Sequence, residues 1–128
     1  GTYVLSSGYY DAYYIKAQKI RSLIKNDYNE AFKKVDAILT PSTPSTAFEI
    51  ENEPTDPVQT YLNDIFTVPI NLAGIPAISI PFANDENNLP IGLQLITNSF
   101  EEQKLLNIAK NVQDTINYSS EPEKWWVK

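Results

Sequence analysis

The stretch VPINLAGIPAISIPF, residues 68–82, carries the clearest indication of fold class in this chain. Its positions are almost all apolar, yet prolines stand at 69, 76 and 81. Proline has no N–H to donate to a neighbouring strand, so a strand paired along its whole length should not contain three prolines. The isoleucines between them, and Val68 just before the first one, favour buried strands rather than a loop. We therefore expect a sheet-forming segment whose backbone is fixed at a few points by proline.

The prolines divide this stretch into parts with different predicted structures. Pro69 is expected to stop regular structure, and residues 71–74 are expected to form a turn or a short helix. Pro76 then restarts the chain as an extended segment. The sequence AISIPF, residues 77–82, predicts a buried strand whose end is marked by Pro81.

Two other apolar runs have the length of strands. IGLQLI, residues 91–96, follows a polar loop and can pair with residues 77–82 as a hairpin. DAILT, residues 36–40, predicts a buried strand that stops at the proline-containing sequence PSTPST. Residues 36–64 carry six acidic side chains and no basic one. Among them Glu49, Glu51 and Glu53 alternate as on an exposed extended segment, and nothing apolar nearby would raise a carboxyl pKa, so these three predict a solvated loop rather than a catalytic carboxylate pair.

Helical spacing of apolar residues marks the beginning of the chain. The predicted stripe runs through Tyr10, Tyr13, Ala17, Ile20 and Ile24. Asn26 and Asp27 are expected to end this helix. Asp27 and Glu30 have the spacing of a capping box, which predicts a second, short helix through Val35.

Two further helices are predicted after residue 57. VQTYLNDIF, residues 58–66, has helical spacing of its apolar residues. Ser99 and Glu102 form a second capping-box pattern before a long amphipathic helix. The apolar face of that helix is predicted to contain Leu105, Ile108, Ala109, Val112 and Ile116.

Composition excludes several kinds of function for this chain. The net charge is −6 and Arg21 is the single arginine, which disfavours nucleic-acid binding by these residues alone. The absence of cysteine and histidine removes disulfides, Ser-His and Cys-His catalysis, and zinc or haem ligation by these residues. No apolar run is long enough to span a membrane. The chain has no methionine, and together with an expected open sheet edge this suggests a piece of a longer protein.

Strands that are apolar on both faces and alternate with helices predict an α/β sheet covered by helices on both sides. We divide residues 1–128 into a helical segment (1–35), sheet and pocket loops (36–96), a C-terminal helix (97–118) and a tail (119–128).

Four sequences resemble the amidase signature family, in order along the chain: LSSGYYDAYYIKAQKIRSLIKNDY, DAILTPSTPSTAFEI, YLNDIFTVPINLAGIPAISIPF and LPIGLQLI. Within that family they resemble the A subunits of glutamyl-tRNA(Gln) amidotransferases. The resemblance covers residues 1–117 and implies a C-terminal portion of the α/β/α layered amidase fold, with a mixed central sheet. It also implies that the proline-punctuated stretch leads from a substrate pocket into the sheet.

The resemblance implies a glutaminase that supplies ammonia for converting Glu-tRNA(Gln) to Gln-tRNA(Gln). The implied partners are B and C subunits, which would make most of the tRNA contacts and use ATP and magnesium; this chain would bind no cofactor. The implied location is the cytoplasm or an organellar matrix. The family's catalytic lysine and serine motifs are not found here, so the fragment alone is expected to be inactive. Ser6-Ser7-Gly8 lacks the flanking glycines of an oxyanion hole and is not taken as a substitute.

One site residue is implied by the resemblance. Asp64 in YLNDIFT matches the family's aspartate that holds the α-ammonium group of the substrate glutamine. The chemistry is consistent, because a carboxylate can pair with an ammonium group. The family's carboxylate-binding arginine has no match, since Arg21 lies in a different motif. Two alternatives stay open: a fragment of another amidase-signature amide hydrolase, and a non-catalytic interaction domain.

Overall fold

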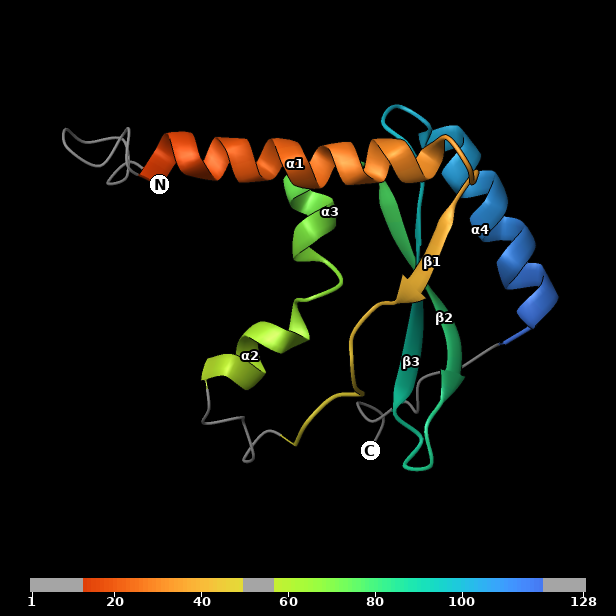
Figure 1. Ribbon diagram of the computed structural model, residues 1–128. Coiled ribbons are helices and arrows are strands. Elements are labelled where there is room, and N and C mark those ends of the chain that lie inside the picture. The colour runs from red at the N-terminus through yellow and green to blue at the C-terminus, as the bar shows by residue number, and fades with distance from the viewer. Residues whose placement is uncertain (1–12, 50–56, 119–128) are drawn as a thin grey trace.

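The computed structural model describes residues 13–49 and 57–118. Within these residues the chain forms helices and strands in the order α1 (Ile15–Phe32), β1 (Ile38–Pro41), α2 (Pro57–Asn63), α3 (Val68–Ala73), β2 (Ala77–Asn84), β3 (Pro90–Ile96) and α4 (Glu102–Ile116) (Figure 1). The strands form one antiparallel sheet in the order β1-β3-β2. The predicted hairpin of β2 and β3 is confirmed. The predicted mixed α/β class is also confirmed, although the strands described here are all antiparallel.

The two faces of the sheet are covered by different helices. Successive residues of a strand point to opposite faces, and the central strand β3 shows this directly. Leu95 packs in a core cluster with residues of α4, whereas Ile96 packs with residues of α1 and α3. We call the first side the α4 face and the second the α3 face. The result is the three-layer α/β/α arrangement that the sequence predicts (Figure 1).

The α4 face has a continuous apolar core. Ile80 of β2 and Leu95 of β3 are buried against Leu105 and Ala109 of α4. The partly buried residues around them include Ile108, Val112 and Ile116. The apolar stripe predicted for α4 is therefore confirmed at every one of its positions.

The α3 face has a second core where α1 and α3 meet the sheet. Ile70, Ala73 and Ile96 are buried here, with Ala73 only 1% exposed. Tyr28 and Phe32 of α1 pack against this cluster, with their ring centroids 6.4 Å apart. Burial raises the pKa of the Tyr28 hydroxyl.

The predicted break in α1 at Asn26 and Asp27 is wrong, because one helix continues from Ile15 to Phe32. Both residues are exposed, so their weak helix propensity costs little. The next turns bring Tyr28 and Phe32 onto the α3 core, and this packing outweighs the local preference. The N-terminal part of the predicted stripe does not form a buried face, since Tyr13 and Ile20 are exposed.

The prediction for Pro69 is also wrong, because Pro69 lies in the first turn of α3 instead of stopping regular structure. Proline is tolerated there since the first N–H groups of a helix have no intrahelical partner. The helix ends at Gly74, which has a φ of 67° and donates its N–H to the Ile70 carbonyl at 3.0 Å. Glycine adopts this left-handed conformation without a Cβ clash.

The strand β2 does not end at Pro81 as predicted, but continues to Asn84. A register shift between Pro81 and Ala83 accommodates the proline. The strand is also not fully buried, since Ile80 is its single buried residue. β1 is likewise only half-buried. Both are outer strands of the described sheet, and proline is acceptable in such positions because the outer edge needs no donor.

The predicted Ser99 cap of α4 is wrong. The residue preceding the helix is Glu101, and no side chain caps it. The chain enters α4 through Thr97, whose side chain is fully buried and donates its hydroxyl hydrogen to the Glu101 carbonyl at 3.3 Å. Lys104 in the first turn contacts the Asp36 carboxylate at 2.7 Å, and this hydrogen bond lowers the pKa of Asp36.

The turn between β2 and β3 is organised by Asp85. Its carboxylate accepts hydrogen bonds from the N–H groups of Asn87 at 2.8 Å and Leu89 at 2.9 Å, and from the Thr46 hydroxyl at 2.8 Å. The Leu89 hydrogen bond, followed by that of Thr46, lowers the pKa of Asp85. The same carboxylate thus closes the hairpin and attaches the loop that follows β1.

Some sequence predictions lie outside the described residues, namely Tyr10, the Ser6-Ser7-Gly8 sequence and the tail 119–128. Among the described helices, none is long and apolar enough to cross a membrane.

Candidate functional site

Asp64 lies in the turn that joins α2 to α3. Its N–H donates to the Tyr61 carbonyl at 3.2 Å, and its own carbonyl accepts from the N–H groups of Thr67 at 3.1 Å and Val68 at 3.0 Å. The backbone of Asp64 is therefore fixed on both sides. The helix predicted over residues 58–66 therefore ends earlier, at Asn63, and Asp64 lies in the turn between it and the proline-punctuated stretch.

Asp64 forms no ion pair with a cation among the described residues, 13–49 and 57–118. The residue is exposed. A carboxylate on a fixed backbone without an intramolecular cation can accept an external ammonium or guanidinium group.

A buried glutamine connects this turn to the sheet. Gln94 of β3 lies on the α3 face and is only 6% exposed. Its Nε2 donates to the Phe66 carbonyl at 2.9 Å and to the Thr40 hydroxyl of β1 at 3.1 Å. Both N–H groups of the amide are thus used, one within the sheet and one on the turn that contains Asp64.

A cavity of about 390 Å³ lies between α3 and the strands next to this glutamine. Thr67 and Asn71 contribute polar groups from the helix side, and Ser79 and Gln94 contribute them from the sheet. Ile70, Ile75, Ala77 and Ile78 complete the lining. Thr67 also donates its N–H to the Asp64 carbonyl, so the cavity and the Asp64 turn share a residue.

Two serine hydroxyls meet on the same face of the sheet. The Oγ atoms of Ser42 and Ser79 are 2.6 Å apart. They meet over Gly92, where a Cβ would come within 2.8 Å of the Ser42 hydroxyl and 2.9 Å of the Ser79 hydroxyl. Within the described residues, neither hydroxyl bonds to a lysine or a carboxylate. A serine without a neighbouring base is a weak nucleophile, and the described residues supply neither hydroxyl with one.

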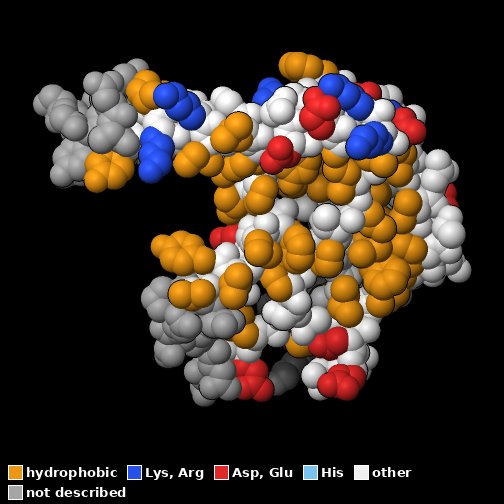
Figure 2. All heavy atoms as spheres, in the orientation of Figure 1, with side chains coloured by type: hydrophobic (Ala, Val, Ile, Leu, Met, Phe, Trp, Pro, Cys, Tyr) orange, Lys and Arg blue, Asp and Glu red, His pale blue; other side chains and the backbone are white. Residues whose placement is uncertain are grey.

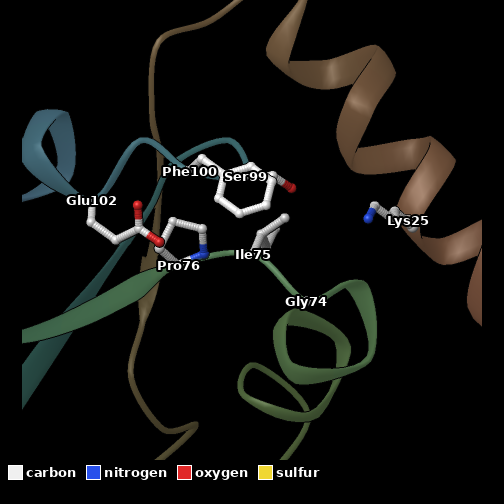
Figure 3. Close-up of a pocket in the computed structure, with 7 residues that line it drawn as sticks. All are labelled: Lys25, Gly74, Ile75, Pro76, Ser99, Phe100 and Glu102. Atoms are coloured by element: carbon white, nitrogen blue, oxygen red, sulfur yellow. The ribbon is translucent and has the colours of Figure 1, made fainter.

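A second cavity, of about 320 Å³, lies at the other end of α3. Figure 3 shows Lys25 of α1 and Glu102 of α4 on opposite sides of it, with Phe100 and Ile75 between them. Phe100 is 94% exposed and has a φ of 64°. The two charged groups do not pair with each other, and no ligand chemistry follows from this arrangement.

Arg21 does not take part in the Asp64 site. Its Nε donates to the Leu72 carbonyl at 2.7 Å, near the C-terminal end of α3. A cation at this end of a helix satisfies a free carbonyl and complements the helix dipole. The expectation that Arg21 has no carboxylate-binding role remains a prediction, and the contact gives the residue a structural role.

No cluster of three or more metal-ligating side chains occurs among the described residues.

The sequence analysis does not predict that Gln94, Thr40 and Ser79 contribute hydrogen bonds or polar groups near the Asp64 turn. The signal for Gln94 was present, since IGLQLI contains a single polar side chain in an otherwise apolar run. A buried amide must find hydrogen-bond partners, which marks such a position as a link to other segments. The identity of those partners depends on the strand register, which pairs Gln94 with Thr40 on one side and Ser79 on the other.

Figure 2 shows hydrophobic side chains gathered over the region of α2, α3 and the lower side of α1. The exposed large hydrophobic residues of these helices include Leu23, Tyr61, Leu62 and Leu72. The α3 face is thus bordered by apolar surface that the described residues do not cover.

The three-layer fold and the proline-punctuated stretch agree with a comparison of the chain with known families. Residues 1–106 match the family described as Amidase. Because this match covers most of the chain, the chain belongs to the amidase family. Within the family it resembles the A subunits of glutamyl-tRNA(Gln) amidotransferases.

Two relatives of this kind illustrate the resemblance. The chain is 63% identical over 128 residues to the A subunit of the glutamyl-tRNA(Gln) amidotransferase of Pelagibacter ubique, covering 100% of this chain and 26% of the relative. It is 51% identical over 127 residues to the corresponding A subunit of Maricaulis maris, covering 99% of this chain and 26% of the relative. The chain therefore spans about a quarter of the length of these relatives.

A solved structure supports the same assignment. The crystal structure of the A subunit of the glutamyl-tRNA(Gln) amidotransferase of Thermotoga maritima superimposes with a TM-score of 0.80 at 48% sequence identity. The superposition covers 94% of this chain and 26% of that structure.

Proposed function

We propose that this chain is a portion of the glutamine-hydrolysing A subunit of a tRNA-dependent amidotransferase. In this proposal the subunit releases ammonia from glutamine, and B and C subunits use it to convert Glu-tRNA(Gln) to Gln-tRNA(Gln) with ATP and magnesium. The names of the relatives and the 63% identity to one of them support the proposal. The proposed location is the cytoplasm or an organellar matrix.

Asp64 is the residue through which this portion takes part in the reaction. We propose that its carboxylate binds the α-ammonium group of glutamine, while the nucleophile and its activating groups belong to the rest of the longer protein. The observation that carries this role is the geometry of the turn. Asp64 has a backbone fixed by three hydrogen bonds, a side chain without an intramolecular cation among the described residues, and a neighbouring cavity lined by Thr67, Ser79 and Gln94.

The test is the variant Asp64→Asn in the intact subunit. Asparagine keeps the size of the side chain and removes its charge, so the ammonium group loses its partner. In the intact subunit, the bound glutamine and the rest of the longer protein would cover this charge pair. Removing one member of such a desolvated, hydrogen-bonded pair costs about 2–5 kcal/mol. We therefore expect kcat/KM for glutamine to fall by roughly thirty-fold to several thousand-fold.

The controls separate substrate binding from folding. A simple amide without an α-ammonium group should be hydrolysed by the variant and the parent at nearly equal rates. Asp27→Asn makes the same chemical change at an exposed position of α1 and should leave both activities unchanged. Equal losses on both substrates, or no loss on glutamine, would remove Asp64 from the substrate site.

A further inference from the structure

Gln94 is the single described side chain that ties the sheet to the turn before α3 through a hydrogen bond. The turn includes Asp64, and α2 ahead of it lies apart from the sheet (Figure 1). On the α3 side the turn continues directly into the helix through the hydrogen bonds from Thr67 and Val68 to the Asp64 carbonyl. The position of the turn relative to the sheet therefore depends on few contacts.

The hydrogen bond to Phe66 has no substitute within the described backbone. Phe66 lies two residues before Val68, the first residue of α3, and its carbonyl accepts from the Gln94 amide. A carbonyl oxygen is only a hydrogen-bond acceptor. The Gln94 amide must therefore turn its NH₂ group, and not its oxygen, toward the Phe66 carbonyl. The second N–H of the same group is held by the Thr40 hydroxyl, which fixes the rotation of the amide.

We propose that Gln94 is a positioning residue for Asp64. Its amide holds the Phe66 carbonyl, and thereby the 64–67 turn, in the place that the Asp64 carboxylate needs to bind the ammonium group of the substrate. This inference rests on the proposed function of Asp64. Gln94 itself does not touch the substrate in this role, and its effect passes through the backbone of the turn.

The variant that tests this role is Gln94→Met in the intact subunit. Methionine has a similar length and no N–H, so it leaves the Phe66 carbonyl without its donor. We expect kcat/KM for glutamine to fall about tenfold, as for the loss of a buried hydrogen bond, while the simple amide is affected less than about twofold. Gln103→Met, at an exposed position of α4, is the matched control and should change neither activity.

A double variant shows whether the effect passes through Asp64. In the Asp64→Asn background, adding Gln94→Met should lower glutamine turnover by less than about a further twofold, because the group that was positioned is already absent. Independent, multiplicative losses would overturn the proposal. So would a loss in Gln94→Met that is equal for both substrates. If Gln94→Met does not yield folded protein, Gln94→Asn takes its place. That variant keeps the amide and shortens its reach by one methylene, and the same selective loss is expected.

Hydrogen exchange gives a readout that does not depend on activity. The amides of Thr67 and Val68, which bond to the Asp64 carbonyl, should exchange faster in Gln94→Met than in the parent or in Gln103→Met. Unchanged exchange would overturn the positioning role, whatever the kinetics show. A selective loss in Asp64→Asn without one in Gln94→Met overturns this inference and leaves the proposed function intact. The absence of a selective loss in Asp64→Asn overturns both.

Discussion

The two faces of the sheet differ in how completely the described residues cover them. On the α4 face, one amphipathic helix places Leu105 and Ala109 directly on Ile80 and Leu95, and the contact is apolar throughout. On the α3 face, the apolar core around Ile96 gives way to polar side chains and a cavity.

The difference separates residues that stabilise the fold from residues that present groups to a ligand or to other parts of a longer protein. On the α4 face the helix covers β2 and β3, whereas Leu39 of β1, which pairs with Leu95 and lies on the same face, is 55% exposed. The α3 face instead holds the buried amide of Gln94, the Asp64 turn and exposed hydrophobic residues such as Leu23. We expect substitutions on the α4 face to act mainly on stability, and those around Asp64 to act mainly on function.

The largest stability effect is expected for Leu105→Ala on the α4 face. Leu105 is buried in the core cluster, so truncation should lower the free energy of unfolding by about 2–5 kcal/mol through lost burial and a cavity. Leu23→Ala is the matched control on α1, where the side chain is 66% exposed. It should change the free energy of unfolding by less than about 0.5 kcal/mol. Urea unfolding of the 128-residue chain measures both values, and similar costs at the two sites would contradict the comparison of the faces.

A smaller, pH-dependent effect is expected at the β2–β3 turn, which belongs to neither face. The folded-state pKa of Asp85 is lowered, chiefly by the Leu89 hydrogen bond. A carboxyl group with a lowered pKa stabilises the folded state above its unfolded-state pKa, and this contribution is lost as the pH falls through the folded-state value. Stability should therefore decrease in acid below about pH 4, and Asp85→Asn should weaken that dependence.

The measurement is an acid titration followed by the amide resonances of Asn87 and Leu89, whose N–H groups bond to the Asp85 carboxylate. Asp27→Asn serves as the control and should leave these resonances and their titration unchanged. Amide shifts that do not respond to acid in the parent chain would show that the carboxylate does not organise the turn.

The smallest effect is expected at Phe100, where the chain approaches α4. Three described non-glycine residues have positive φ, and the other two, Asn88 and Asn117, are asparagines. Asparagine tolerates this conformation better than phenylalanine, and Phe100 has little burial to lose because it is 94% exposed. Phe100→Asn should raise the free energy of unfolding by about 0.5 kcal/mol, measurable as a higher Tm. A decrease would indicate that the aromatic ring contributes packing that outweighs the backbone strain.

The faces also differ in how far the sequence predicts them. The α4 stripe is predictable because helical spacing alone determines which residues share a face. The predictions at Asn26, Asp27 and Pro69 are wrong for a common reason. Each of these residue types disfavours a helix locally, but the size of the effect depends on where in the helix the residue lies and how exposed it is. Asn26 and Asp27 are exposed, so they do not interrupt α1. Pro69 lies in the first turn of α3, where its missing N–H costs no hydrogen bond.

The candidate site is predictable only in part. The sequence predicts a helix before the proline-punctuated stretch but ends it at residue 66, so it does not place Asp64 in the turn. The assignment of Asp64 to a substrate comes from the family resemblance. The connection from Gln94 to Phe66 joins positions 28 residues apart, and it depends on strand register and on where α3 begins. Neither is determined by local pattern, because a shift of one residue in register would turn Gln94 to the α4 face.

Gly92 has a consequence for how this sequence can vary during evolution. The Ser42 and Ser79 hydroxyls occupy the space that a Cβ at position 92 would enter, at 2.8 Å and 2.9 Å from it. A single change from glycine to alanine would therefore clash with both serines, and it becomes acceptable only when one or both of them move or are replaced. Both hydroxyl oxygens are the ends of side chains that can rotate, so an alanine at position 92 would cost the hydrogen bond between Ser42 and Ser79 rather than require their replacement.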